Sequence, residues 1–202
     1  MARYDAAHKQ ASRERILEAA RREFRTRGFD EVSIDTLMRR AGLTRGAFYA
    51  HFDSKEALVL EVLDIEAGLV LQLQAAADAG DHAAGASAVR TYLDPDERRD
   101  VASNCPLVCH PVDAIRGDVS RRAAYTDRVN ALIAALAELG DLSDDDAVLA
   151  SILTVGAAQL SAAVGDDQLA DRISSAGREA VERVLAISSC RRRCRRWSRR
   201  PV

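Results

Sequence analysis

Aromatic residues are scarce in this chain: they make up 4% of its 202 residues, whereas hydrophobic residues of all kinds make up 48%. The expected core is therefore built mainly from Ala, Leu, Val and Ile, and the Ala-rich runs favour closely packed helices over sheets. No internal period of about 20–50 residues recurs, so solenoid architectures find no support. We expect an all-α protein.

Long apolar runs are also lacking. No stretch approaches the ~20 apolar residues that span a bilayer, and the first nine residues lack the apolar core of a signal peptide. We therefore expect a cytoplasmic protein with no membrane partner. Only four cysteines are present, and in a reducing compartment they are expected to be free thiols, redox-active groups or metal ligands rather than structural disulfides.

Charge is present in both signs but is unevenly distributed behind a formal net charge of −2. Residues 1–55 hold 12 Lys and Arg against 8 Asp and Glu, a net charge of +4. Residues 56–187 hold 10 against 23, a net charge of −13, and residues 188–202 hold 7 Arg and no acid. Phosphate contacts dominate nucleic-acid affinity, so we expect the basic N-terminal segment, rather than the acidic body, to meet a polyanion.

Helical periodicity, caps and glycines divide the chain into segments. A first helix is expected from Ser12, as its N-cap, to Arg27, with Gly28 ending it. Ser33 caps a second helix, which Gly42 breaks. Further helices are expected after Thr44 and over residues 54–79, 86–93, 120–139, 143–164 and 167–186, with breaks at residues 80–85, 94–100, 140–141 and 165–166.

These segments form three parts. Residues 1–55 are expected to be an N-terminal three-helix helix-turn-helix domain, residues 56–187 a helical-bundle domain, and residues 188–202 a disordered Arg-rich tail. Such a tail would add non-specific attraction to DNA, although an altered reading frame would also explain its composition.

The most informative stretch covers residues 33–52, which read as two short helices joined by a Gly-containing turn. Such a unit can lay its second helix in the DNA major groove. Leu37, Ala41, Phe48 and Phe52 are expected in its core. Because this stretch lies in the basic segment, a DNA-binding regulator is the leading interpretation.

The segment from about residue 12 to residue 63 resembles the N-terminal DNA-binding domain of the TetR family of bacterial transcriptional repressors. The residues that carry the resemblance are Arg15-Ile16-Leu17-Glu18-Ala19-Ala20, Phe24, Gly28-Phe29, Val32-Ser33-Ile34, residues 41–52 and Ser54-Lys55-Glu56-Ala57-Leu58. In that family, an all-helical domain binds ligands and dimerises, and two heads bind a near-palindromic operator. The resemblance implies a homodimeric repressor without enzymatic activity or cofactor, which a small-molecule effector releases from double-stranded operator DNA.

The resemblance also implies which residues contact DNA. Arg45 lies near the start of the recognition helix, where an Arg can bond bidentately to guanine, and Gly46 leaves room for close approach. Tyr49 and His51 are similar to positions that contact phosphates in family members. The expected DNA-binding residues are Ser33, Thr44, Arg45, Gly46, Tyr49, His51 and Lys55.

Several of these residues have simpler roles as alternatives. Ser33 is a helix cap first and a phosphate contact second, whereas Thr44 can both cap its helix and reach a phosphate or base. His51 could instead be packed in the core, whereas the charge of Lys55 would add to the backbone amides at the start of the next helix. Arg39 and Arg40 are expected on a solvated helix face, with a phosphate contact from one of them as the alternative.

Cys105 is a candidate effector or sensor residue. The stretch Asn104-Cys105-Pro106-Leu107 looks like a Gly-Cys-Pro-Leu stretch that opens a core helix in one subgroup of the family. A thiol at a helix N-terminus tends to form the reactive thiolate, which would suit an electrophile or redox sensor; a buried small hydrophobe is the alternative. The spacing of Cys109-His110 and of Cys190 and Cys194 gives a zinc site little support, so we expect no metal.

Two other functions compete with the effector-released repressor. One is a constitutive DNA-binding protein with no effector. The other is an enzyme with a Cys/His site, which is disfavoured because no Asp or Glu stands at a telling spacing from Cys105 or His110. The last two body helices are the expected dimer interface, because small and apolar side chains along them allow close contact: Leu149, Ile152, Leu153, Val155, Ala158 and Leu160.

Overall fold

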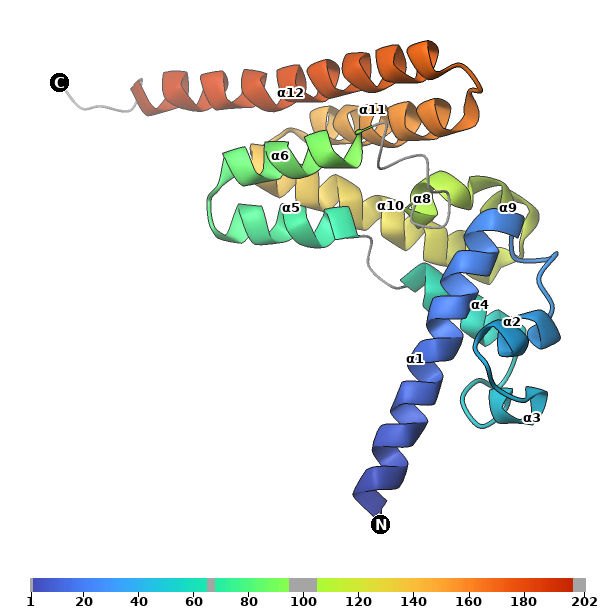
Figure 1. The fold of residues 1–202 in the computed structure, drawn as a ribbon. Helices are drawn as coiled ribbons and strands as arrows, with labels where there is room; N and C mark the ends of the chain where they lie inside the picture. The colour runs from blue at the N-terminus through green and yellow to red at the C-terminus, as the bar shows by residue number, and fades with distance from the viewer. Residues whose placement is uncertain (1, 65–67, 95–104, 198–202) are drawn as a thin grey trace. The chain divides into compact units, whose positions relative to one another are not determined.

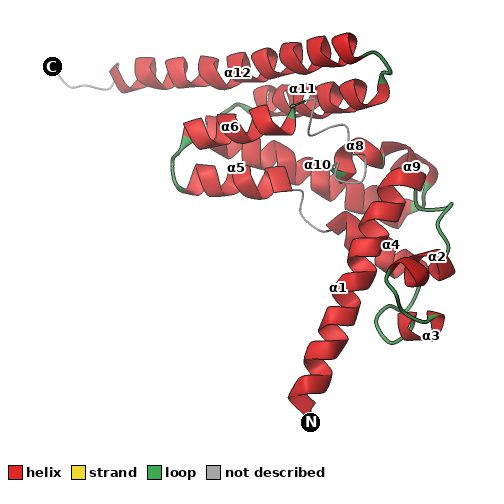
Figure 2. Ribbon diagram, in the orientation of Figure 1, coloured by secondary structure: helices red, strands yellow, loops and turns green. Residues whose placement is uncertain are grey.

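The computed structural model describes residues 2–64, 68–94 and 105–197, with side chains from residue 7 to residue 186 within these ranges. The described residues form helices joined by loops and contain no strand, so the all-α expectation is confirmed (Figure 2). In chain order the helices are α1 (Ala2–Arg27), α2 (Ile34–Arg40), α3 (Arg45–Phe48), α4 (Lys55–Asp64), α5 (Gly68–Asp78), α6 (His82–Tyr92), α8 (Pro106–Cys109), α9 (Pro111–Arg116), α10 (Val119–Gly140), α11 (Asp144–Ala163) and α12 (Asp167–Trp197), as Figure 1 labels them.

The helices form two compact units, whose limits differ from the boundary expected at residue 55. The first unit comprises residues 1–65 and 101–126, and the second comprises residues 66–100 and 127–202. Helices α8 and α9 therefore pack with the N-terminal helices rather than with the acidic body. Helix α10 contributes its first residues to one unit and its remaining residues to the other.

The first unit has a core in which aromatic side chains from separate segments meet. Phe24 and Phe29 meet edge to face, with ring centroids 5.2 Å apart, and Phe48 lies 5.6 Å from Phe52. All four rings are buried, together with aliphatic residues from α1, α2 and α4. The scarce aromatics are thus concentrated where this small unit needs large side chains to exclude water.

Helix α1 begins ten residues earlier than expected. It starts at Ala2, so Ser12 is not an N-cap but a buried residue inside the helix. The preceding residues contain no proline or glycine, and their Ala, Lys, Gln and Arg side chains favour a helix. The expected end is right: Gly28 has a φ of +79°, and its N–H donates to the Phe24 carbonyl at 2.7 Å.

Helix α2 has the cap and stop that the sequence predicts. The Ser33 hydroxyl accepts a hydrogen bond from the Thr36 N–H at 3.1 Å. At the other end, Gly42 has a φ of +64°, and the Leu43 N–H donates to the Met38 carbonyl at 2.8 Å. This closure of the last turn by a left-handed glycine sets the direction in which the chain enters α3.

The helix expected over residues 54–79 is described as two helices, α4 and α5, on either side of residues 65–67, which lie outside the described residues. Helix α6 also differs from the expectation, because it begins at His82 behind an Asp81 cap. Gly85 lies inside this helix rather than in a loop. A Cβ at Gly85 would clash with the Leu139 side chain, so the absence of a side chain at Gly85 permits close packing on α10.

Helices α11 and α12 pack against each other in the second unit. Ser143 caps α11, and its hydroxyl accepts from the Asp146 N–H at 3.3 Å. A Cβ at Gly177 of α12 would clash with the Ala157 Cβ, which shows how closely these helices approach. Helix α12 continues to Trp197, so the backbone of residues 188–197 is helical where a disordered tail is expected. Residues 198–202 and the polar segment at residues 95–100 lie outside the described residues.

Helix α11 is also apolar enough, by length and composition alone, to span a membrane. Its mean hydropathy is 1.4 over the apolar window, which departs from the expectation that no run qualifies. Three aspartates occupy its first turn, and Ala147, Ala150 and Thr154 are buried on one face. A core helix of a globular protein passes the same test, so this finding is weak evidence for a membrane span.

Candidate nucleic-acid interface

Helix α3 presents an exposed polar surface on a rigid support. The side chain of Arg45, the first residue of α3, is 62% exposed. Tyr49, the C-cap of α3, is 57% exposed. On the opposite side of the same short helix Phe48 is fully buried, and its ring meets that of Tyr49 edge to face at 5.3 Å. The buried ring fixes the helix, and the exposed residues remain available for contact with a partner.

Gly46 adds open space to this surface. A Cβ built on it would meet nothing within 4 Å, and its φ is not in the left-handed region. Neither packing nor backbone geometry within the chain therefore requires a glycine at this position. Room for a partner to approach the backbone closely is a physical reason for one.

Arg45 is held by an ion pair that can exchange. Its Nη1 donates to Asp35 Oδ2 at 2.6 Å, and both side chains are more than half exposed. Ion pairs between exposed side chains contribute only about 0–1 kcal/mol, so moving the guanidinium to a base edge or a phosphate costs little. The pair orients Arg45 without making it unavailable.

The two predicted hydroxyl contacts differ in how they are occupied. The Ser33 Oγ already accepts from the Thr36 N–H and lies 3.0 Å from the Thr36 hydroxyl. Thr44 is exposed at the N-cap position of α3, but its side chain makes no capping hydrogen bond. The expected capping role of the Thr44 side chain is therefore wrong, and its hydroxyl has no capping bond to give up.

His51 lies half-buried in the turn that follows α3. Burial lowers its pKa, and the nearby positive charges of Lys9 and Arg13 lower it further. Its Nδ1 atom is buried without a hydrogen-bond partner. Any contact from His51 to phosphate would therefore have to offset the burial and the neighbouring positive charges that oppose its protonation.

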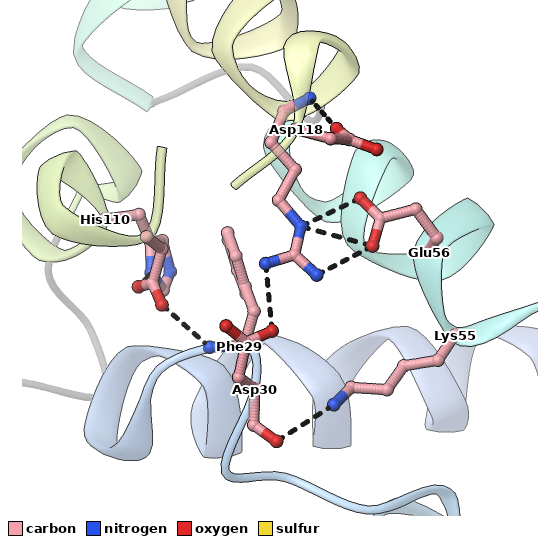
Figure 3. A network of polar contacts seen from close by, with 8 residues as sticks. Phe29, Asp30, Lys55, Glu56, His110 and Asp118 are labelled. Atoms are coloured by element: carbon pink, nitrogen blue, oxygen red, sulfur yellow. Dashed lines mark hydrogen bonds and ion pairs between the residues drawn. The ribbon is translucent and has the colours of Figure 1, made fainter. Parts of the chain in front are cut away.

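Lys55 belongs to a different group of residues. Its ammonium donates to the backbone carbonyl of Asp30 at 3.3 Å (Figure 3). Burial lowers the pKa of Lys55, while the nearby Asp30 carboxylate raises it. The structure thus gathers Thr44, Arg45, Gly46 and Tyr49 around α3, and it places Lys55 in a network within the first unit.

Arg121 is the centre of this network, and sequence reasoning missed it. Its guanidinium donates to both carboxylate oxygens of Glu56, at 2.7 and 2.8 Å, and to Asp30 Oδ1 at 3.0 Å (Figure 3). The hydrogen bonds to Glu56 raise the pKa of Arg121 although burial opposes them. The partners lie 65 and 91 residues away along the chain, so no local pattern could reveal them.

His110 has an acidic partner, which corrects the expectation that none stands at a telling spacing. Its Nδ1 lies 2.9 Å from Asp113 Oδ2, and Asp113 Oδ1 accepts from the Phe29 N–H at 3.0 Å. Burial raises the pKa of Asp113, but the hydrogen bonds from His110 and Phe29 lower it overall. One helical turn separates His and Asp, a spacing that sequence reasoning could have used.

Cys105 is half-buried at the N-cap of the four-residue helix α8 and makes no side-chain capping bond. Burial lowers the pKa of Arg25, and electrostatic interaction with Cys109 and Cys105 raises it. Tyr125 lies nearby: burial, followed by the interaction with Cys105, raises its pKa to about 12. Within the described ranges, no group of three or more His, Cys, Asp or Glu side chains is placed to hold a metal ion.

Helices α2 and α3, joined by the turn at Gly42, have the arrangement of a helix-turn-helix unit, and α3 carries its exposed surface. Residues 16–62 match the family model described as "Bacterial regulatory proteins, tetR family". The HTH-type transcriptional regulator YdgC of Bacillus subtilis is 42% identical over 52 residues, which cover 26% of this chain and 27% of YdgC. The matched segments span 20–47% of the lengths of the curated relatives.

Solved structures match nearly the whole chain. SCO4454, a TetR-family transcriptional regulator from Streptomyces coelicolor, is 26% identical with a TM-score of 0.63, and the match covers 89% of this chain and 97% of that one. The SmeT–triclosan complex is 21% identical with a TM-score of 0.62, covers 88% and 91%, and shows a shared fold. The family-model match is thus confined to residues 16–62, and SCO4454, a TetR-family regulator, is similar to this chain over nearly its whole length. These relatives are regulators rather than enzymes.

Proposed function

We propose that this protein is a homodimeric, cytoplasmic transcriptional repressor that binds operator DNA through α3 and is released by a small-molecule effector. The observation that carries the proposal is the α3 surface. Arg45 and Tyr49 are exposed there beside the open Gly46, while Phe48 on the same helix is fully buried. A recognition helix needs this combination of a rigid base and an exposed reading surface.

The α3 residues divide into readers and anchors. Arg45 has the two parallel N–H donors that match guanine O6 and N7, so we assign it to base readout. Tyr49 has an exposed phenol, and Thr44 has a hydroxyl without a capping bond; both suit phosphate contacts that position the protein without selecting sequence. Ser33, His51 and Lys55 remain proposed phosphate contacts.

An apolar strip on α11 supports the dimer. Leu149, Ile152 and Leu160 are exposed there, whereas Ala158 is buried and takes no part in an outer surface. Leu169 of α12 is exposed as well. Exposed apolar side chains along one helix are a common mark of a helix-to-helix interface, and two heads on one dimer would match a near-palindromic operator.

The effector is proposed to act on the second unit. The SmeT structure is a complex with triclosan, in a protein that shares this fold. A ligand that binds one conformation better than another shifts the equilibrium by its differential affinity alone. Release follows if the favoured conformation changes the separation of the two recognition helices, because both must fit major grooves at a fixed spacing.

The test begins with selection of an operator from random duplex DNA by the full chain. Fluorescence anisotropy then compares Arg45→Ala and Tyr49→Ala with Arg90→Ala. Arg90 is a matched control, since it is also an exposed Arg in an ion pair, with Glu182 at 2.9 Å, but lies in the second unit. We expect Arg45→Ala to cost about 1–3 kcal/mol of binding and to relax sequence preference. Unchanged binding by folded Arg45→Ala and Tyr49→Ala would overturn the site assignment.

A constitutive DNA-binding protein is the competing function. A library of apolar and cationic compounds, screened by thermal shift and by loss of operator binding, separates it from a repressor with an effector. The proposal requires at least one compound that both stabilises the protein and weakens its complex with DNA. A library in which stabilising compounds leave DNA binding unchanged would favour the constitutive protein.

Sensing by Cys105 is a second candidate, because this half-buried free thiol lies at the N-cap position of α8. Rapid alkylation of Cys105 at neutral pH, with loss of operator binding that Cys105→Ser prevents, would support this candidate. Slow labelling would assign Cys105 to packing.

A further inference from the structure

A polar clamp joins residues on both sides of the helix-turn-helix stretch. We use the word clamp for His110, Asp113 and Arg121, which lie on or beside α8, α9 and α10. On the N-terminal side of the stretch, Asp113 Oδ1 accepts from the Phe29 N–H at 3.0 Å, and Arg121 Nη1 donates to Asp30 Oδ1 at 3.0 Å. The clamp therefore holds the turn that leads into α2.

The other side of the stretch is held by the same guanidinium. Arg121 Nε and Nη2 donate to the two oxygens of Glu56 at 2.8 and 2.7 Å, and Glu56 is the second residue of α4 (Figure 3). Such bidentate pairs are charge-assisted and fix orientation as well as distance. The side chain of Arg121 is only 12% exposed, which limits screening of its charge by solvent.

Close packing supports the polar contacts. The Phe29 ring is fully buried and stacks on the His110 ring, with centroids 4.3 Å apart. The Arg121 guanidinium lies over the Phe29 ring, 5.6 Å from the ring centroid. Gly28 completes the fit, because a Cβ there would lie 2.9 Å from Asp113 Oδ1. Backbone, ring and carboxylate thus allow little movement of residues 28–30.

We propose that Arg121 and Asp113 are positioning residues that restrict the helix-turn-helix stretch to one orientation and thereby set the spacing selectivity of the operator. This inference rests on the proposed function. Residues 33–52 lie between the two held points, residues 29–30 and residue 56, so the clamp fixes both ends of the DNA-reading stretch. Arg121 also lies on α10, which continues as one helix to Gly140 in the second unit.

Loosening the clamp changes which operators the protein accepts. If residues 29–30 and residue 56 are no longer held, the helix-turn-helix stretch samples more orientations. A dimer then reaches half-sites at more than one separation. The selected operator would bind less tightly, because ordering the head on DNA now costs entropy. Operators with altered spacing would lose less affinity, or would gain it. Clamp variants should therefore lower the ratio of the affinity for the selected operator to the affinity for an operator with altered spacing.

The experiment measures that ratio by fluorescence anisotropy, using the full chain and the operator that the wild type selects. Operators lengthened or shortened by one base pair between half-sites serve as the second ligand. We expect Arg121→Ala to reduce the wild-type affinity ratio by about fivefold or more, at the lower end of typical coupling between sites. Arg121→Lys should not restore it, because one ammonium cannot reproduce the bidentate bond to Glu56 while reaching Asp30.

Arg122→Ala is the matched control. Arg122 is exposed and donates to the Ile115 carbonyl at 3.0 Å, so its removal leaves the clamp contacts in place. The control should keep the wild-type ratio. If Arg121→Ala fails to fold, Glu56→Gln and Asp30→Asn carry the test, because each weakens one side of the clamp without removing the guanidinium.

The outcomes separate the clamp from the proposed function. A lower ratio in folded clamp variants supports the proposal. Equal loss of affinity for every spacing, or an unchanged ratio, overturns it, since either result assigns the clamp to stability alone. If the wild type selects no operator, the proposed function fails and the clamp inference falls with it. If the wild type selects an operator and the ratio does not move, only the clamp inference fails.

Discussion

Replacing Gly46 by Ala should stabilise the protein and weaken its binding to DNA. Gly46 lies in α3, has no positive φ, and a Cβ there meets nothing within 4 Å. Alanine removes backbone freedom from the unfolded chain and exposes no new strain in the folded one. Opposite effects on stability and affinity would mean that the glycine serves a partner rather than the fold.

The expected stability gain is modest because α3 has only four residues. Gly to Ala in a helix interior is worth about 0.5–1 kcal/mol, and Gly46 lies in the first turn, so we expect about 0.5 kcal/mol. For a chain of this size that corresponds to a rise in Tm of about 1–2 °C. The loss on DNA should be larger. A methyl group that prevents close approach displaces the neighbouring contacts, each worth about 1–3 kcal/mol.

Urea denaturation measures the first effect, and anisotropy on the selected operator measures the second. Gly68→Ala is the matched control, since Gly68 is also helical, exposed and free of contacts within 4 Å, but lies on α5. The control should leave DNA binding unchanged. If Gly46→Ala keeps the wild-type operator affinity, the assignment of α3 to DNA contact is refuted. If Gly46→Ala is less stable than the wild type, a side chain at position 46 does meet a steric obstacle.

Three further changes test the fold and assembly. Gly42→Ala should lower the free energy of unfolding by about 1–2 kcal/mol in urea titrations, because φ is +64° there and an L-residue is strained. Asp113→Asn should destabilise the protein at neutral pH but less at acid pH. Folding lowers the pKa of Asp113 from its usual value of 3.8. The stability that the charged carboxylate contributes is therefore present above the usual pKa and is lost as the pH falls through the pKa of the folded state. Urea titrations of the wild type and of Asp113→Asn at neutral and acid pH check this. A difference in free energy of unfolding between the two proteins that stays constant with pH would contradict it. Ile152→Glu should convert dimers to monomers in sedimentation experiments, whereas Leu71→Glu, also exposed but on α5, should not; dimers of both variants would exclude α11 as the interface.

Helix caps and glycines, which are read from the local sequence, predicted much of the structure of residues 1–55. Gly28 and Gly42 were expected to end helices, and both have positive φ. The Ser33 cap is also confirmed, because a single hydroxyl beside the start of the helix decides it. The start of α1 could not be predicted in this way, since no cap or break separates its first residues from those after Ser12.

Long-range contacts explain what the sequence did not reveal. Gly85 looked like a loop residue, but close packing against Leu139 uses a glycine inside a helix. The α3 residues were predicted together because one short segment carries them. Arg121 was missed because its partners Glu56 and Asp30 are distant in sequence and meet only after folding.

Photo-crosslinking from position 49 tests most directly whether α3 contacts DNA. Tyr49 is 57% exposed, so a photoreactive phenylalanine can replace it in the full chain. The same probe at Leu71, exposed on α5 of the second unit, is the control. We predict crosslinks from position 49 to two symmetric sites in the selected operator and none from position 71. An operator complex that crosslinks from position 71 but not from position 49 would contradict recognition by α3.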